Sequence, residues 1–343
     1  MINSGEKISR NAPGALRLGA IELPGRAFLA PMSGITDIGM RRVASRCGAG
    51  LVISEMVAAN FYIAADEETR LRAEGEGLPV HVVQIAGREP LALAEAARLA
   101  EAAGAHAIDI NMGCPAKRVV GGYAGSALMR EPDLALSLVR AVVAAVTAPV
   151  SVKMRLGWDA DSLNAPVLAR AMEAEGVALI TVHGRTRNQF YKGRADWAAI
   201  RAVREAISIP LVANGDCASL ADARAMLAAS GADAAMIGRA AMGRPWLVGE
   251  IAAGLDGRPW RAPSPRERAN AALEHYRTLL DLFGERQGVR HARKHLAAYA
   301  DHAMDEGMGL SPAMRTKLVT TTDAQEAADL LEQAFQSAQE LAA

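Results

Sequence analysis

Eight short apolar segments alternate along this chain with Ala-rich segments of helical periodicity, and this alternation is the feature that most restricts its fold. Each apolar segment is too short for a helix and is bounded by glycine, proline or polar residues. Such alternation is typical of parallel strands joined by crossover helices. The expected strands are Arg26–Pro31, Gly50–Ser54, Val80–Ile85, Ala105–Ile110, Val150–Met154, Leu179–Val182, Leu211–Ala213 and Ala234–Ile237.

Eight buried strands without regular apolar–polar alternation fit a closed (β/α)8 TIM barrel, which typically takes about 250 residues. An open, doubly wound sheet is the alternative, but the GxGxxG fingerprint after a first strand is missing from the sequence. We therefore expect a TIM barrel in residues 1–255. Its helices are expected to include Leu91–Ala103, Leu134–Val146, Ala165–Glu175, Trp197–Ala206 and Leu220–Ala229.

The pattern changes after Leu255, where glycine and proline gather and no further strand follows. Ser264-Pro265-Arg266-Glu267 combines a helix cap, proline at the first helical position and glutamate at the third. Two apolar stripes at helical spacing follow, from Ala269 to Phe283 and from Val289 to Ala303. Ser311-Pro312 and Thr322-Asp323 are two later helix starts. Residues 256–343 are therefore expected to form a small all-helical domain.

Composition restricts the function and the compartment. The 38 basic and 38 acidic residues give zero net charge, which argues against a general nucleic-acid binder. The segment from Arg258 to Lys294 has nine basic residues and four acidic ones. This excess of positive charge indicates either a solvated helical surface or a patch that faces phosphates. Three scattered cysteines form no disulfide framework and no Cys/His cluster that indicates a metal. Without an apolar span or signal peptide, we expect a cytoplasmic monomer with no metal and no membrane contact.

Polar residues and glycines gather where the expected strands end. In a TIM barrel the loops after the strands share one rim, and active sites lie there. Each residue alone has an ordinary structural explanation, but burying so many polar groups without use is unfavourable. The candidate rim residues are Pro31, Met32 and Ser33, Gln84, Asn111 and Cys114, Lys153 and Arg155, His183 and Arg185, Asn214, Gly215 and Asp216, and Gly238 and Arg239.

The loops after the last two strands indicate a phosphate site. Glycine turns at Gly215 and Gly238 free backbone N–H groups to face an anion, and Arg239 adds positive charge. Lys153 and Gln84 would contact another polar part of the same ligand. Flavin mononucleotide (FMN) meets both requirements, and so does a sugar phosphate, so that spacing alone does not choose between them.

Cys114 lies in an abrupt turn, between Gly113 and Pro115, directly after a buried strand. It could be a core thiol, a nucleophile or a proton donor. A thiol is mostly protonated at neutral pH and can act as a general acid. The connection that follows, 116–129, is long and contains several glycines, which predicts a mobile flap over the site.

Taken together, these motifs resemble the tRNA-dihydrouridine synthases, in particular their bacterial type B branch. The resemblance covers about Leu18 to Ile251 and extends weakly into the helical tail. The matching stretches are Ala30-Pro31-Met32, Gln84-Ile85, Asn111-Met112-Gly113-Cys114-Pro115, Lys153-Met154-Arg155, His183-Gly184-Arg185-Thr186-Arg187, Asn214-Gly215-Asp216, Ile237-Gly238-Arg239-Ala240-Ala241 and Gly243-Arg244-Pro245-Trp246.

The resemblance implies FMN at the rim. NADPH, or NADH, would reduce the flavin, which would pass hydride to C6 of a uracil in tRNA. By similarity, Gln84 and Lys153 bind the polar edge of the flavin ring. The ring itself would be lined by Pro31, Met32 and Ser33, and the ribityl phosphate would be held by His183, Asn214, Gly215, Asp216, Gly238 and Arg239.

The resemblance also implies roles on the substrate side. Cys114 would protonate C5 of the uracil from the face opposite the flavin, and the base would have to leave its stack to reach the barrel. Asn111, Arg155 and Arg185 would bind the flipped base. Three basic residues of the tail would face the tRNA backbone, namely Arg290, Arg293 and Lys294.

Three other functions remain open at the level of the sequence. Lys153 at a strand end also fits a Schiff-base enzyme that acts on a sugar phosphate. A second possibility is another flavin barrel that reduces a free pyrimidine or a similar small molecule. The third is an RNA-binding protein without catalytic activity.

Overall fold

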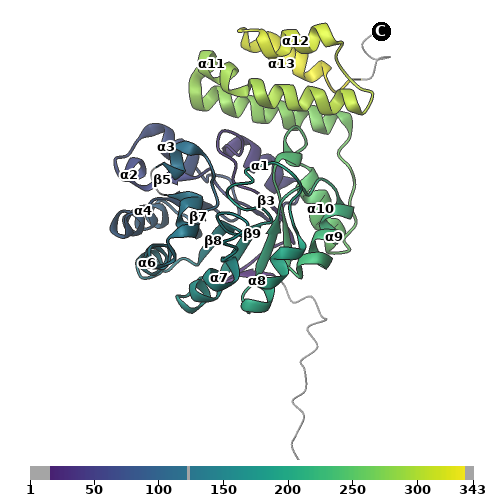
Figure 1. Ribbon diagram of the computed structural model, residues 1–343. Helices are drawn as coiled ribbons and strands as arrows, with labels where there is room; N and C mark the ends of the chain where they lie inside the picture. Colours follow the sequence, from purple (N-terminus) through teal and green to yellow (C-terminus); the bar gives the residue numbers. More distant parts are fainter. Residues whose placement is uncertain (1–15, 122–123, 337–343) are drawn as a thin grey trace, which may run out of the picture.

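The predicted TIM barrel is present in the computed structural model, which describes residues 16–121 and 124–336 (Figure 1). Its parallel sheet has nine strands in the order β4-β3-β11-β10-β9-β8-β7-β6-β5. The strands are β3 (Ala27–Leu29), β4 (Leu51–Val52), β5 (Val57–Ala58), β6 (Val82–Ala86), β7 (Ala107–Met112), β8 (Val150–Arg155), β9 (Leu179–His183), β10 (Leu211–Asn214) and β11 (Ala234–Ile237).

The two ends of this sheet meet. Ile53, directly after β4, forms a parallel bridge with Val82 of β6, and Val57 of β5 pairs with Ile85 of the same strand. β4 and β5 are thus two halves of one barrel position, interrupted between Ile53 and Val57. The cylinder closes with eight positions, and β5 is a continuation that the sequence pattern did not predict.

The amino end of the barrel is closed by a short antiparallel hairpin, also not predicted, of β1 (Arg17–Leu18) and β2 (Ile21–Glu22). Leu18 and Leu23 from this segment pack with Phe28 and with the first residues of several strands in one apolar cluster. A larger apolar core fills the space between the strands and the surrounding helices.

Local sequence signals account for the helix boundaries. Ser219 accepts a hydrogen bond from the backbone N–H of Asp222, and left-handed glycines follow three helices at Gly104, Gly176 and Gly231. The helices around the barrel are α1 (Ile38–Arg46), α2 (Ala59–Ile63), α3 (Glu67–Ala73), α4 (Pro90–Ala102), α5 (Lys117–Val120), α6 (Pro132–Val143), α7 (Ala165–Ala174), α8 (Arg201–Ala206), α9 (Leu220–Ser230) and α10 (Leu247–Leu255), with 3-10 turns η1 (Gly125–Arg130), η2 (Ala198–Ile200) and η3 (Arg239–Ala241).

The tail is helical, as expected, with α11 (Pro265–Asp305), α12 (Pro312–Thr320) and α13 (Ala324–Gln333). Gly284, with φ 70° and ψ 158°, divides α11 into two arms. The rings of His275 and His295 lie with centroids 4.5 Å apart, whereas a straight helix would separate them by roughly 30 Å. The arms therefore run antiparallel.

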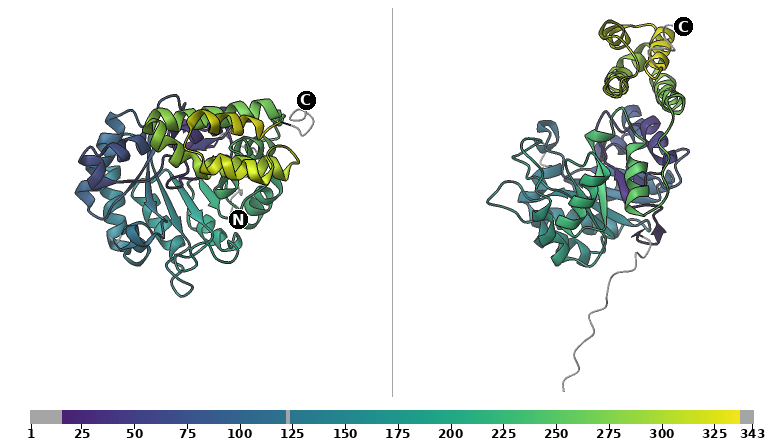
Figure 2. Two further views of the ribbon diagram at one scale, coloured as in Figure 1. Left: turned by 90° about the horizontal axis from the view of Figure 1, so that it is seen from above. Right: turned by 90° about the vertical axis from the view of Figure 1, so that its right-hand side faces the viewer.

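The helical region packs on the α1 side of the barrel (Figure 2). Val43 of α1 and Trp246 before α10 belong to the same apolar cluster as the inner faces of α11 and α13. Arg46 of α1 forms an ion pair with Glu274 at 2.6 Å. Residues 256–264 connect the two parts. In the described part of the chain, no helix is both long enough and apolar enough to span a lipid bilayer.

Candidate active site at the carboxyl end of the barrel

Polar side chains fill the carboxyl end of the barrel because they share one face of their strands. Successive residues of a strand point to opposite faces, and residues in register on adjacent strands point to the same face. Register pairs Asn111 with Lys153, and it pairs His183 with both Arg155 and Asn214. Four strand ends thus bring these five predicted site residues together.

A chain of hydrogen bonds runs from the barrel interior to the turn that carries Cys114. Gln84 Nε2 donates to Asp109 Oδ2 at 2.6 Å, and Asn111 Nδ2 donates to Gln84 Oε1 at 2.8 Å. Asn111 Oδ1 then accepts the backbone N–H groups of Gly113, at 3.2 Å, and Cys114, at 3.0 Å. The position of the cysteine turn is therefore set by side chains of two neighbouring strands.

Asp109, the first residue of this series of hydrogen bonds, is fully buried and was not among the predicted site residues. Burial raises its pKa to about 6, against the hydrogen bonds from Gln84 and Ser151 that favour the carboxylate. Ser151 Oγ donates to Asp109 Oδ1 at 2.6 Å. The signal that could have found Asp109 is an acid two residues before Asn111, and hence on the same face of the strand.

Contacts to the following segment also hold Cys114, which is half-buried. Its carbonyl oxygen accepts the backbone N–H of Ser126 at 3.1 Å and the Ser126 hydroxyl at 2.9 Å. Gly125 has φ +59°, and a Cβ there would lie 2.8 Å from the Cys114 oxygen. The predicted mobile flap over 116–129 is wrong for its second half, because η1 is buried against β7 and β8. Residues 122–123 of the predicted flap lie outside the described residues.

The hydrogen bonds of Arg155 go to backbone carbonyl oxygens of the surrounding loops. It is buried, and its Nε donates to the Gly113 oxygen at 2.7 Å. Its Nη1 donates to the carbonyl oxygens of Thr186 and Phe190, both at 2.9 Å. With these bonds, Arg155 ties the cysteine turn to the loop after β9. Its predicted contact with the substrate base stays a prediction.

An ion pair joins the buried Arg185 to Asp216, whose side chain is partly exposed, and both residues were predicted to contact a ligand. Arg185 Nη2 lies 2.6 Å from Asp216 Oδ2, and Arg185 Nη1 donates to His183 Nε2 at 3.2 Å. Asp216 also accepts the backbone N–H of Ala195 and pairs with Arg239 at 3.4 Å. Asp216 thus orients the two arginines, and its predicted place beside the ligand stays a prediction.

Positive charge is concentrated around His183. Burial lowers the pKa of His183 well below its ordinary value, and the nearby charges of Lys153, Arg155, Arg185 and Arg239 lower it further. Burial, together with Arg155, also lowers the pKa of Lys153 to about 8. An anionic ligand would relieve this repulsion.

Beside these cations lie a glycine that close packing requires and a buried hydroxyl that has no partner in the described residues. Gly215 has φ +122°, and a Cβ there would lie 2.6 Å from Ala195 Cβ and 2.9 Å from His183 Cδ2. Thr181 Oγ1, on the strand that carries His183, is buried without a hydrogen-bond partner in the described part of the chain. Gly238, by contrast, has a negative φ, and a Cβ there would meet only Met32 Sδ at 3.8 Å, so crowding does not require glycine there.

The loop after β3 lies beside the loop after β11, as the approach of Met32 to Gly238 shows. Pro31 and Met32 are half-buried, and Ser33 is exposed. The backbone N–H of Met32 donates to Thr36 Oγ1 at 2.8 Å, which fixes the start of the loop. This arrangement places an apolar edge next to the cationic end of the barrel.

Tyr191, in the loop after β9, was not predicted. Its side chain is an exposed aromatic, 54% accessible. The guanidinium carbons of Arg239 and Arg155 lie 5.1 and 5.6 Å from its ring centroid, and the His183 ring centroid lies 6.5 Å away. An aromatic residue in a loop after a strand end is the signal that could have identified it.

The three basic residues predicted to face tRNA divide into two groups. Arg290 and Lys294 are exposed, and Lys294 Nζ lies 3.3 Å from where a Cβ on Gly34 would be. Lys294 therefore reaches the rim loop after β3. Arg293 is half-buried, and its Nη2 donates to the Thr320 oxygen at 3.2 Å. This bond links α11 to α12, so the geometry gives Arg293 an internal contact.

The fold and the rim define a TIM-barrel protein with a cationic site at the carboxyl end. Two solved structures share this fold: a histamine dehydrogenase from Rhizobium sp. 4-9 (TM-score 0.53, 16% identity) and a 2-naphthoyl-CoA reductase (TM-score 0.54, 14% identity). The matches cover 71% and 73% of this chain, which spans about half the length of each structure, 47% and 52%.

Sequence comparison gives the family. The dihydrouridine synthase model matches residues 28–340. A "Probable tRNA-dihydrouridine synthase" of Rhizobium leguminosarum bv. phaseoli is 52% identical over 88% of this chain and 93% of that protein. A protein of the same name from Rhodobacter capsulatus is 48% identical over 93% of this chain and 98% of its own length. The "tRNA-dihydrouridine synthase B" of Xanthomonas axonopodis pv. citri is 47% identical over 84% of this chain and 87% of its own length. The chain belongs to the dihydrouridine synthase family.

Proposed function

We propose that this enzyme reduces the C5=C6 bond of uridine in tRNA to dihydrouridine, with FMN as cofactor and NADPH or NADH as the source of hydride. Family membership supports the reaction. The observation that carries the proposal is the hydrogen-bond chain from Asp109 through Gln84 and Asn111, which holds the Cys114 turn at the cationic end of the barrel. A proton donor and an anion site thus share one rim.

The cationic end fits the phosphate and the polar edge of a flavin nucleotide. Lys153 and Gln84 would hold the edge of the ring, with Pro31, Met32 and Ser33 along its apolar face. Arg239, His183 and Asn214, together with backbone N–H groups of Gly215 and Gly238, would hold the phosphate end. When bound and reduced, the flavin supplies the hydride that goes to C6.

Cys114 would complete the saturation of the double bond. One hydride at C6 and one proton at C5 convert the C5=C6 bond into a single bond, and the Cys114 thiol would give the proton. The proton donor must face the flipped base from the side opposite the flavin. Asn111, which fixes the Cys114 backbone, retains one amide N–H with which to contact the base.

The base must leave its stack to enter the barrel, and an exposed ring at the rim favours this step. Tyr191 offers its face beside Arg155 and Arg239. Lys294 and Arg290, exposed on the helical region, would contact backbone phosphates. We infer that the protein works as a single copy in the cytoplasm, with the barrel up to residue 255 catalytic and the helical region from 256 binding tRNA.

The test is the Cys114→Ala variant. We expect it to retain FMN, because the Cys114 contacts in the structure come from its backbone, and to lose about 100-fold or more of its tRNA reduction. Flavin absorbance and dihydrouridine formed under NADPH measure the two effects. Ser126→Ala, which removes only a hydroxyl bond to the Cys114 carbonyl, is the control. Unchanged turnover in Cys114→Ala would remove its assigned role.

Two further measurements separate the other candidate functions. A wild-type protein that is colourless and takes up no added FMN would favour Schiff-base chemistry at Lys153. A free pyrimidine reduced as fast as tRNA would favour a small-molecule reductase. Mapping of dihydrouridine in tRNA from cells that lack this protein would identify the modified positions.

A further inference from the structure

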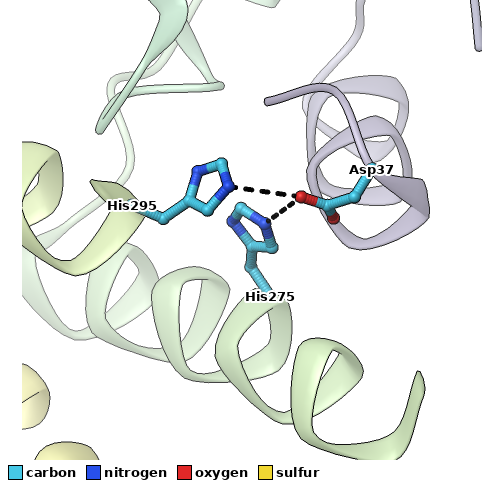
Figure 3. Close-up of side chains that lie close together, drawn as sticks. All are labelled: Asp37, His275 and His295. Carbon is cyan, nitrogen blue, oxygen red and sulfur yellow. Dashed lines mark hydrogen bonds and ion pairs between the residues drawn. The ribbon is translucent and has the colours of Figure 1, made fainter. Parts of the chain in front are cut away.

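Three titratable side chains from distant parts of the sequence converge between the barrel and the helical region (Figure 3). Asp37 caps α1, whereas His275 and His295 come from the two arms of α11. Asp37 Oδ2 lies 3.1 Å from His275 Nε2 and 3.4 Å from His295 Nε2. All three residues are buried, and one ligand atom from each lies within 4.8 Å of the others. The cluster lies outside the proposed active site.

Two other polar atoms of the cluster have their own partners. Asp37 Oδ1 accepts the backbone N–H of Met40 at 3.1 Å, and His275 Nδ1 pairs with the Tyr299 hydroxyl at 3.1 Å. His295 Nε2, in contrast, is buried and has no hydrogen-bond partner in the described part of the chain, although it points at Asp37. Two imidazole nitrogens thus face one carboxylate oxygen.

We propose that Asp37, His275 and His295 form a binding site for a divalent transition-metal ion, with Zn²⁺ as the ion to be tested. Imidazole and carboxylate are common zinc ligands. With metal–ligand bonds of about 2.0–2.1 Å, tetrahedral ligands lie roughly 3.3–3.4 Å apart. The two observed separations from Asp37 Oδ2, 3.1 and 3.4 Å, are close to this value. Water would be the fourth ligand.

The surroundings orient the ligands as those of a metal site do. When His275 Nε2 binds a metal, Nδ1 keeps its proton and would donate a hydrogen bond to the Tyr299 hydroxyl. A Cβ on Gly39 would lie 2.9 Å from His275 Cδ2, so glycine at this place on α1 lets the imidazole reach Asp37. The adjacent cation, Lys294, extends toward Gly34.

The origin of the ligands gives the site a structural role. Asp37 belongs to the barrel, and the two histidines belong to the two antiparallel arms of α11. A bound ion would therefore join both arms to the barrel close to the rim. This role is independent of flavin, of tRNA and of the proposed reaction.

The experiment measures zinc binding by the full-length chain. Protein stripped with a chelator is loaded with Zn²⁺, desalted and analysed for metal, and the affinity is measured by competition with a chromophoric chelator. We expect about one zinc per chain in the wild type. Loss of an outer-shell partner of a metal site lowers the affinity about 10–100-fold. His295→Gln and Asp37→Asn each remove a ligand, so their loss of zinc affinity should be larger. His291→Gln is the matched control, because His291 is exposed on the same arm and stacks on Phe283.

Two further readouts do not depend on how well the ligand variants fold. Tyr299→Phe should weaken zinc binding by about 10–100-fold while retaining the ligands. X-ray absorption of the zinc-loaded wild type should show two imidazoles in the first shell. A wild type that retains no more zinc than His295→Gln, or a zinc shell without two imidazoles, would overturn the site and leave an ordinary hydrogen-bonded cluster. Neither readout depends on tRNA reduction.

Discussion

Lys153 is the rim residue whose charge responds most directly to pH. Burial lowers its pKa to about 8, the positive charge of Arg155 lowers it as well, and the charge of Asp109 opposes the change. At neutral pH the side chain is therefore still mostly charged, whereas an ordinary lysine would stay charged to a much higher pH. We therefore expect Lys153 to make ligand binding at the rim depend on pH.

We expect FMN affinity to fall as the pH rises above about 8. An anionic ligand stabilises the charged lysine and raises its pKa, so binding takes up a proton above the pKa of the free protein. The affinity is full below that pH and then falls by up to about tenfold per pH unit. Flavin fluorescence titrations from pH 7 to 9.5 measure the effect.

Lys153→Met is the variant that tests this coupling. It should bind FMN more weakly at pH 7 and should show no decline with pH that can be assigned to residue 153. An equal slope in the wild type and in Lys153→Met would show that another group controls the pH dependence.

At the scale of elements, the connection from β11 to α10 determines how the second arm of α11 packs. Gly243, in this connection, has φ +72°, and a Cβ there would overlap the carbonyl oxygen of Ala298. Trp246, three residues later, stacks on Tyr299 with centroids 6.3 Å apart. The barrel and the helical region therefore touch backbone to backbone at one point, beside an aromatic contact.

Gly243→Ala should destabilise the protein for two reasons. Its left-handed backbone disfavours a Cβ by about 1–2 kcal/mol, and the overlap with Ala298 adds about 1–3 kcal/mol. Gly257→Ala is the control, because Gly257 also has a positive φ, 66°, but has nothing within 4 Å of a Cβ. Urea unfolding measures both variants. Equal losses of stability in Gly243→Ala and Gly257→Ala would show that the close approach of Gly243 to Ala298 adds nothing to the loss.

At the scale of the whole molecule, the helical region and the rim form one surface. Lys294 of α11 reaches Gly34 in the loop after β3, and the cluster of Asp37, His275 and His295 lies directly behind this contact. A tRNA bound to the helical region would therefore lie next to the opening of the barrel. The chain as a whole has no net charge, so we expect any attraction for tRNA phosphates to come from this local surface.

Replacing Arg290 and Lys294 with alanine should weaken tRNA binding and reduce its salt dependence. Each lost phosphate contact lowers the slope of log K against log salt by about 1. Arg98→Ala, which removes an exposed arginine from α4, is the control. Filter binding at several salt concentrations gives the slopes. If the double variant keeps the wild-type slope, this patch is an ordinary solvated surface and does not bind tRNA phosphates.

The sequence alone was sufficient for the eight main strands of the barrel, for five of the ten helices that the structure describes around it and for the positions of the rim residues. Asn111, Lys153 and His183 could be found because each ends an apolar run, and strand ends of a barrel lie at one rim. The contacts of Arg155 could not be found. Its donors are taken by loop carbonyls, and the conformation of those loops leaves no periodic pattern in the sequence.

What the sequence by itself determined is local: hydrophobic period, helix caps and left-handed glycines set the elements and their order, and the motifs gave the family. What only the tertiary structure decided is which distant side chains meet. Asp37 and His295 are separated by most of the chain, and they meet because Gly284 reverses α11 and Gly39 lets it pack on α1. The physical reason is that burial and close packing join surfaces whose complementarity is spread over the whole chain.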